Sequence, residues 1–408
     1  MTAAAELRAQ GDAAKPLEIF LVAAEESGDR LGAALMTALR QRSARPVRFS
    51  GVGGRQMEAA GLESLFPIGD LSIMGFTSIP RRLPRIIGYM ATTVRAVLAR
   101  RPDALIAIDS PAFSLRVARF VRRFDPSIPI IDYVSPSVWA WRPGRARSMS
   151  RYVDHVLALL PFEPDVHRKL GGPPCTYVGH PLIEEVSTLR PSEAEMHRRM
   201  DGPPVVLVMP GSRSSEVGRL TGVFGDALAR VAERVGSIEA VLPTVPHLLD
   251  QVAQAVSAWK IKPRIVVDQA EKLAAFRIAR AALAKSGTTT LELAVAGVPM
   301  VAAYKVSRLE LEVGKLLVRV PSFILPNLVL NRNVVPELIQ HYCTAEALAD
   351  TLIPLLRDTP QRRRQLDAFA TLDAILEIGS RAPAARAADV VIASLRGGGA
   401  MAAAGRNG

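Results

Sequence analysis

Two glycine- and hydroxyl-rich stretches in the second half of this 408-residue chain carry its clearest chemistry, Pro210–Glu216 and Ser286–Glu292. Each follows an apolar, strand-like run and opens a helical pattern. Glycine lets a backbone approach a ligand closely, hydroxyls donate hydrogen bonds, and a helix N-terminus carries partial positive charge. Two such turns in one domain therefore predict a site for a nucleotide diphosphate.

Arg213 and Glu292 give the two turns different chemistry. The planar fork of Arg213 suits a diphosphate, although a surface salt bridge is the alternative. The carboxylate of Glu292 suits ribose hydroxyls. The hydroxyls of the second turn could also simply cap a helix, which uses the same backbone geometry as phosphate binding. The predicted nucleotide contacts are Gly211, Ser212, Arg213, Glu216, Ser286, Gly287, Thr288, Thr289 and Glu292.

The first half of the chain carries carboxylates at the corresponding positions. Asp109 ends the apolar run Ala104–Ile108, where a general base would stand, or it caps the next turn. The acidic turn Glu25–Asp29 opens another helix and favours a hydroxyl-rich substrate over phosphate. His180 is a candidate second acid/base or nucleotide contact, with a structural role as the alternative.

Charge indicates an anionic partner. The formal net charge is +12, from 51 Lys+Arg against 39 Asp+Glu, and no strip combines aromatic with basic residues. A phosphorylated substrate or an anionic membrane is therefore favoured, and no nucleic-acid partner is expected. The stretch Met74–Met90, with Arg81, Arg82 and Arg85, predicts a membrane-interfacial surface. A half-buried helix with a solvated basic face is the alternative.

Several classes of site have no signature in the sequence. No Asp-x-Asp triplet occurs and the six histidines lack metal-ligand spacing, so we expect neither a metal nor a cofactor. The phosphate-loop pattern that ends in Gly-Lys-Ser/Thr is also missing. The N-terminus has no signal-peptide core, and no run of about 18 apolar residues predicts a transmembrane helix. Cys175 and Cys343 form no close pair, which fits a reducing compartment.

The elements that must position these residues are short apolar strands that alternate with helices. This order predicts an α/β fold with two Rossmann-like, doubly wound domains facing across a cleft, and ligands at the carboxyl ends of the strands. The predicted strands are 17–23, 47–52, 104–108, 128–134 and 153–160, then 205–209, 240–243, 264–267, 281–284 and 300–304. The predicted divisions are a disordered extension 1–16, a substrate- and membrane-facing domain 17–185, a nucleotide domain 186–345, helices 346–395 that could pack back on the first domain, and a disordered tail 396–408.

The most specific segment is Tyr133–Arg142, which holds two of the three tryptophans. With it, the chain resembles the lipid-A-disaccharide synthase family of inverting glycosyltransferases, from about residue 17 to the last helices. Further matching segments are Glu25 with 27–29, 74–75, 108–111, 160–163, 179–181, 210–213 with Glu216, 286–288 with 291–292, and 325–328.

The resemblance implies a GT-B fold and a reaction. UDP-2,3-diacylglucosamine would donate its sugar to the 6-hydroxyl of 2,3-diacylglucosamine 1-phosphate, giving a β-1,6-linked disaccharide 1-phosphate and UDP. Asp109 matches the candidate base, and the nucleotide contacts match the UDP side. The residues assigned to the acceptor side are Glu25, Ser27, Gly28, Asp29, Met74, Ser135, Trp139, His180 and Asn327. The implied location is cytoplasmic, peripheral on the inner face of the inner membrane, with a homodimer considered.

Three residues depart from the family pattern: Ala24, Ser78 and Ala112. All lie in the first domain, so they bear on the acceptor more than on the UDP sugar. The alternatives are a paralogous transferase with a different acyl-sugar acceptor, a non-catalytic UDP-sugar or lipid-binding protein, and a sugar-nucleotide epimerase on the same fold.

Overall fold

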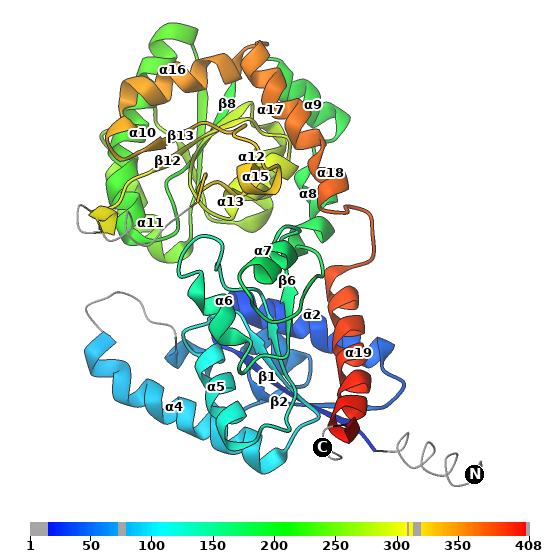
Figure 1. Ribbon diagram of the computed structural model, residues 1–408. Helices are drawn as coiled ribbons and strands as arrows, with labels where there is room; N and C mark the ends of the chain where they lie inside the picture. The colour runs from blue at the N-terminus through cyan, green and yellow to red at the C-terminus, as the bar shows by residue number, and fades with distance from the viewer. Residues whose placement is uncertain (1–14, 72–78, 308–309, 313–319, 405–408) are drawn as a thin grey trace. The chain divides into compact units, whose positions relative to one another are not determined.

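The computed structural model describes residues 15–71, 79–307, 310–312 and 320–404. Its contacts divide the chain into two compact units, each an α/β structure (Figure 1). The first unit runs to Pro181 and resumes at Ser380, and the second comprises Leu182–Gly379. The predicted fold class, two parallel sheets with alternating helices, is confirmed.

The first unit contains a seven-stranded parallel sheet of order β3-β2-β1-β4-β5-β6-β7. Central strands β1 and β4 are almost wholly buried, as expected for a sheet covered by helices on both faces. Its strands are β1 (Leu17–Ala23), β2 (Val47–Val52), β3 (Glu63–Ser64), β4 (Ala104–Ile108), β5 (Ile130–Tyr133), β6 (His155–Ala158) and β7 (Cys175–Tyr177). Its helices are α2 (Glu26–Arg42), α3 (Arg55–Ala59), η1 (Ile68–Asp70), α4 (Ile79–Arg100), α5 (Ser114–Phe124), α6 (Gly144–Met149), α7 (Glu163–Lys169) and α19 (Pro383–Ala404).

Two apolar clusters cover the two faces of this sheet. One joins α2 and α19 to β1 and β4, and the other joins α4 and α5 to them. Helix α19, from the end of the chain, packs along α2 from its beginning (Figure 1), and Arg42 pairs with Asp389 between them. Residues 396–404, expected in a disordered tail, continue α19. Residues 1–14 and 405–408 lie outside the described residues.

The second unit repeats the same topology with a six-stranded parallel sheet of order β10-β9-β8-β11-β12-β13. Helices α10 and α16 pack together over a core that includes β8 and β11. The strands are β8 (Val205–Met209), β9 (Glu239–Pro243), β10 (Arg264–Val266), β11 (Ala281–Lys285), β12 (Met300–Tyr304) and β13 (Glu337–Ile339). The helices are η3 (Pro181–Glu184), α8 (Val186–Leu189), α9 (Glu193–Met200), α10 (Ser214–Val235), η4 (Pro246–Leu248), α11 (Leu249–Val256), α12 (Gln269–Ile278), α13 (Thr289–Val295), α15 (Leu325–Val329), η5 (Gln340–Tyr342), α16 (Ala345–Leu356), α17 (Pro360–Ala370) and α18 (Leu372–Ile375).

The charged segment before β8 is part of the second unit. Helices α8 and α9 contact α12, and the buried Arg199 donates hydrogen bonds of 3.0 Å to the carbonyl oxygens of Phe276 and Arg277. Helix α16 packs on α10, whereas α19 belongs to the first unit, so the structure divides the predicted range 346–395 between the units.

Candidate functional site

The two glycine-hydroxyl turns of the second unit lie side by side. Strands β8 and β11 are parallel neighbours, with Met209 opposite Ala284, so their carboxyl ends bring the turns together. The turns line a pocket of about 400 Å³. The predicted residues in its wall are Gly211, Ser212, Arg213, Glu216, Gly287, Thr288 and Thr289.

Glu216 organises the first turn from inside it. Its carboxylate accepts a hydrogen bond of 3.2 Å from the Ser212 N–H and pairs with Arg213 at 3.1 Å and Lys285 at 3.0 Å. Burial raises the pKa of Glu216, but the charges and hydrogen bonds of Lys285 and Arg213 lower it by more. The net pKa therefore lies below its usual value. Gly211 has a φ of +122°, and a Cβ there would stand 2.3 Å from the Glu216 carboxylate. Only glycine fits this position.

Two lysines in the pocket wall were not predicted from the sequence. Lys285 is the last residue of β11, and Lys272 reaches the pocket from α12. Lys272 pairs with Glu292 at 2.9 Å, which gives the predicted ribose ligand a cationic neighbour. A charged residue that ends a buried apolar strand was the available signal for Lys285. Lys272 had none, because its approach depends on the packing of α12.

Two of the predicted nucleotide contacts, Ser286 and Glu292, are not part of the pocket wall. Glu292 lies beside it through its pair with Lys272, whereas Ser286 is turned to the protein interior. It is buried, and its hydroxyl donates a hydrogen bond of 2.7 Å to the carbonyl oxygen of Phe323. Its side chain therefore fixes the loop beside the pocket, whose wall includes Lys285 and Gly287 on either side of it.

Asp109 occupies the corresponding edge of the first sheet. It follows β4, which pairs with β1 so that Ile108 lies opposite Ala23. Ser27 donates a hydrogen bond of 2.7 Å to one carboxylate oxygen, and the Ser110 N–H donates one of 2.7 Å to the other. The structure therefore brings the predicted turn and the predicted base into contact.

The backbone around Asp109 is strained. Asp109 and Ser110 have φ values of +50° and +45°, in a region that non-glycine residues rarely adopt. Such strain persists only where the surroundings enforce it, and it is frequent at active sites. Gly28 supports this geometry, because a Cβ there would stand 3.3 Å from the carbonyl oxygen of Ile108.

Asp29 has a structural role that differs from its predicted contact with substrate. It is buried, and its carboxylate accepts hydrogen bonds of 2.8 to 3.0 Å from the N–H groups of Gly54, Gln56 and Met57. These bonds cap α3. Glu25 is the exposed N-cap residue of α2 and makes no side-chain cap bond.

The Tyr133–Arg142 segment rests on a buried polar layer. Ser135 lies 2.8 Å from Nε2 of His167, and Nε1 of Trp139 donates a hydrogen bond of 3.2 Å to Glu163. Burial raises the pKa of Glu163 to about 7 and lowers that of His167. Neither residue was predicted as a site residue, although Glu163 lies in a segment that matches the family pattern. Both position the segment from beneath.

His180 lies between Gly179, with a φ of +101°, and Pro181. Burial, and then the charge of Arg30, lower the pKa of His180 to about 4. The ring is therefore neutral near pH 7 and can accept a hydrogen bond, but it holds no proton to donate as an imidazolium acid.

Asn327 uses all its hydrogen-bonding capacity within the second unit. Its Nδ2 donates to the Val335 carbonyl at 2.9 Å and to Glu337 at 3.1 Å, and its Oδ1 accepts the N–H groups of Val334 and Val335. The amide is thus a loop organiser, which differs from the predicted substrate contact.

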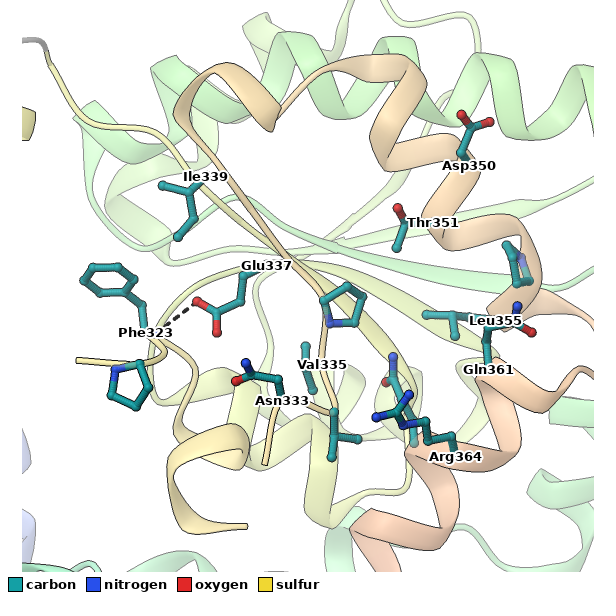
Figure 2. A pocket seen from close by; sticks show the side chains of 15 residues that line it. Phe323, Asn333, Val335, Glu337, Ile339, Asp350, Thr351, Leu355, Gln361 and Arg364 are labelled. Carbon is teal, nitrogen blue, oxygen red and sulfur yellow. Dashed lines mark hydrogen bonds between the residues drawn. The ribbon is translucent and has the colours of Figure 1, made fainter. Parts of the chain in front are cut away.

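Figure 2 shows another pocket of the second unit, into which Glu337 points while it accepts the Phe323 N–H at 3.0 Å. Asn333, Asp350 and Arg364 also line it. None of the predicted site residues lines this pocket.

The predicted membrane stretch is described only in part. Met74 and Ser78 lie outside the described residues, as do the side chains of Arg81 and Arg82. Arg85 pairs with Asp70 at 2.8 Å, and Ile87 on the same helix is 56% exposed. Among the described helices, none combines the length and the apolar character that crossing a bilayer requires. In the same residues, no group of three or more His, Cys, Asp or Glu side chains is placed to hold a metal ion.

Comparisons with known proteins identify the family of the chain. A family model described as lipid-A-disaccharide synthetase matches residues 19–391. A lipid-A-disaccharide synthase from Rhodopseudomonas palustris (strain HaA2) is 58% identical over 93% of this chain and 96% of its own length. A lipid-A-disaccharide synthase from Bradyrhizobium diazoefficiens is 56% identical over 93% of this chain and 97% of its own length. Among solved structures, the S. aureus MnaA–UDP co-structure has a TM-score of 0.58 at 10% identity, covering 92% of this chain and 94% of that one, and supports a GT-B-like fold.

Proposed function

Because the chain belongs to the lipid-A-disaccharide synthase family, we propose that its two strand-edge sites divide one glycosyl transfer between them. The donor is UDP-2,3-diacylglucosamine and the acceptor is 2,3-diacylglucosamine 1-phosphate. The observation that carries the proposal is the Asp109 carboxylate, held by Ser27 and the Ser110 N–H at the end of β4.

The pocket of the second unit binds the UDP moiety. Arg213 and Lys285 face the diphosphate, and the first turn supplies backbone N–H groups at the start of the long helix α10. Glu216 holds both cations in place before the donor arrives. Glu292, anchored by Lys272, accepts hydrogen bonds from the ribose hydroxyls. These cations stabilise the charge that grows on UDP as it leaves, without a metal ion.

Asp109 acts as the general base in a single in-line displacement. The 6-oxygen of the acceptor forms a bond to the anomeric carbon as the bond from that carbon to the UDP oxygen breaks. The hydroxyl proton goes to Asp109, and the electron pair leaves with UDP. Attack from the face opposite UDP inverts the anomeric centre and gives the β-1,6 linkage.

The acceptor is held by the first unit around Asp109. Ser135 and Trp139 shape this side, since each is fixed from below by His167 or Glu163. His180 contributes a neutral ring, and Glu25 an exposed carboxylate for sugar hydroxyls.

The substrates are lipids, so we also propose peripheral binding to the cytoplasmic face of the inner membrane. The exposed Ile87 on α4 and the net charge of +12 support this. Binding to anionic vesicles that weakens as salt rises is expected. Flotation of the chain with vesicles that does not depend on salt would contradict electrostatic binding to the membrane.

We also propose that the chain forms a homodimer, and sedimentation of the full chain tests this oligomeric state.

Mass spectrometry of products tests the proposed reaction. The purified chain, given UDP-diacylglucosamine and the acyl-sugar phosphate, should form the disaccharide 1-phosphate and UDP in equal amounts. Without acceptor, the donor should stay intact. Donor consumed or epimerised in the absence of acceptor would contradict transfer and favour epimerase chemistry. Product formed with another acyl sugar alone would reassign the acceptor.

A further inference from the structure

The first unit contains a pocket of about 380 Å³, whose wall includes four arginines. Arg116 and Arg119 come from α5, and Arg142 and Arg145 come from the end of the Tyr133–Arg142 segment and from α6. The hydroxyl groups of Ser148 and Tyr152 complete its polar lining. None of these residues has a role in the transfer described above.

Within the described residues, none of these four guanidinium groups forms an ion pair with a carboxylate, whereas Arg122, on the same helix as Arg116 and Arg119, pairs with Asp154. Burial lowers the pKa of Arg145, and so do the nearby charges of Arg142 and Arg116, whereas Tyr152 and Asp132 act in the opposite direction. The positive charges are thus close enough to repel one another. An anion bound among these arginines would offset this repulsion.

The wall of this pocket is held in a defined shape. Arg142 and Arg145 both lie over the ring of Trp141, with guanidinium carbons 4.6 and 5.2 Å from its centroid. The backbone of Arg142 has a φ of +53°, a conformation that non-glycine residues rarely adopt. Two arginines are therefore oriented before any ligand binds.

The arginine pocket lies next to Asp109, the proposed general base. Pro111, which lines it, follows Asp109 by two residues, and α5 begins three residues later. A molecule that reaches Asp109 with one end can therefore place its other end among these arginines. The proposed acceptor has this form, since it carries a hydroxyl at carbon 6 and a phosphate at carbon 1.

We infer that the pocket of Arg116, Arg119, Arg142 and Arg145 binds the phosphate monoester of the acceptor. Arginine forks match phosphate oxygens in pairs, and the dianion supplies the charge that the pocket lacks. The inference rests on the proposed function for the identity of the ligand, and it adds a reason for selecting phosphorylated acyl sugars.

Direct binding tests the pocket without catalysis. Glucosamine 1-phosphate should bind to the full chain in calorimetry, and glucosamine should bind at least about tenfold more weakly. Arg119→Ala and Arg145→Ala should each remove this difference. Arg147→Ala is the matched control, because Arg147 is exposed on α6 and outside the pocket. Equal binding of the two sugars, or unchanged preference in the pocket variants, would overturn the inference.

Kinetics then separate this inference from the proposed reaction. The pocket variants should raise the KM for the phosphorylated acceptor about tenfold or more, with the KM for the UDP donor unchanged. If the wild-type chain forms no disaccharide although the phosphate preference is present, the proposed function fails and the pocket remains. If instead the variants lose affinity for phosphatidylglycerol vesicles but keep the preference for glucosamine 1-phosphate, the arginines serve the lipid surface and the inference is wrong.

Discussion

The two sheets share one strand order but carry opposite charges at the same edge. In each, the order reverses between the first strand and its neighbour, at β1 and β4 in one unit and at β8 and β11 in the other. The first unit places Ser27 and Asp109 there, and the second places Arg213 and Lys285. The topology thus fixes where a ligand binds, and a few side chains decide whether the edge removes a proton or stabilises a leaving anion.

The glycine in each turn has a role that matches the charge of its edge. In the second unit, Gly211 lets Glu216 fold into the turn, where it holds two cations. In the first unit, Gly28 lets β4 approach, and strain is borne by Asp109 and Ser110. Gly28 therefore permits close packing of the backbone, whereas Gly211 makes room for a charged side chain.

Asp109→Asn should have the largest effect and tests the acidic edge alone. Asparagine keeps the size of the side chain but cannot take a proton near neutral pH. General-base catalysis contributes about 10²–10⁴-fold, so kcat should fall by at least about 100-fold while the Kd for UDP stays constant. Initial rates of UDP release and calorimetry measure the two quantities. Asp165→Asn, on the exposed face of α7, is the control. Near-normal turnover in Asp109→Asn would remove it from the base role.

The buried glutamates of the two units should respond to pH in opposite ways. The pKa of Glu163 is raised by burial from 4.5 to about 7, so the native first unit holds an extra proton between these values. Its free energy of unfolding should therefore fall as pH rises from 4.5 to about 7, by about 3 kcal/mol, and stay flat above. The net pKa of Glu216 is lowered, so its stabilisation should be present above its unfolded pKa and be lost as pH falls.

Urea unfolding at several pH values measures this contrast. In a Trp259→Phe background, the remaining tryptophans, Trp139 and Trp141, both lie in the first unit, so their fluorescence reports on it. Glu163→Gln should flatten the slope between pH 4.5 and 7, and Glu216→Gln should flatten it only below that range. A slope that persists in Glu163→Gln would show that another group titrates.

Lys285→Met tests the basic edge and should have an intermediate effect. It removes a cation from the pocket while keeping the length of the side chain, so the Kd for UDP should rise by about 10–100-fold. The KM for the acceptor should not change. Lys260→Met is the control, since Lys260 is exposed and pairs with Glu233 outside the pocket. An unchanged Kd would assign the diphosphate to other groups.

The sequence predicted the strands that apolar runs define and missed those that pairing defines. Strands β3, β7 and β13 contain two or three residues each and include polar ones, so only their neighbours in the sheet make them strands. The glycine turns were predicted for the same reason as the long strands: their signal is local.

Contacts between distant segments account for the differences at the site. Asp29 caps a helix that begins 26 residues later, and Asn327 fixes a loop that follows it, so both have structural roles that their motifs do not reveal. Lys272 and the arginine pocket arise from helices whose packing no short pattern encodes. Site residues that lie in local motifs can therefore be predicted from the sequence, whereas the residues that contact them from distant segments can be found only in the folded structure.

Ser27→Ala should have the smallest effect and tests how the acidic edge is positioned. The hydroxyl of Ser27 is exposed and donates one hydrogen bond to Asp109, while the Ser110 N–H holds the other oxygen. A single bond of this kind contributes about 0.5–1.5 kcal/mol, so kcat should fall about threefold to tenfold, with the KM for donor unchanged. Ser27→Thr keeps the hydroxyl and should recover most of the rate. A loss as large as that of Asp109→Asn would make Ser27 a direct participant, and no loss would leave Ser110 as the sufficient anchor of the base.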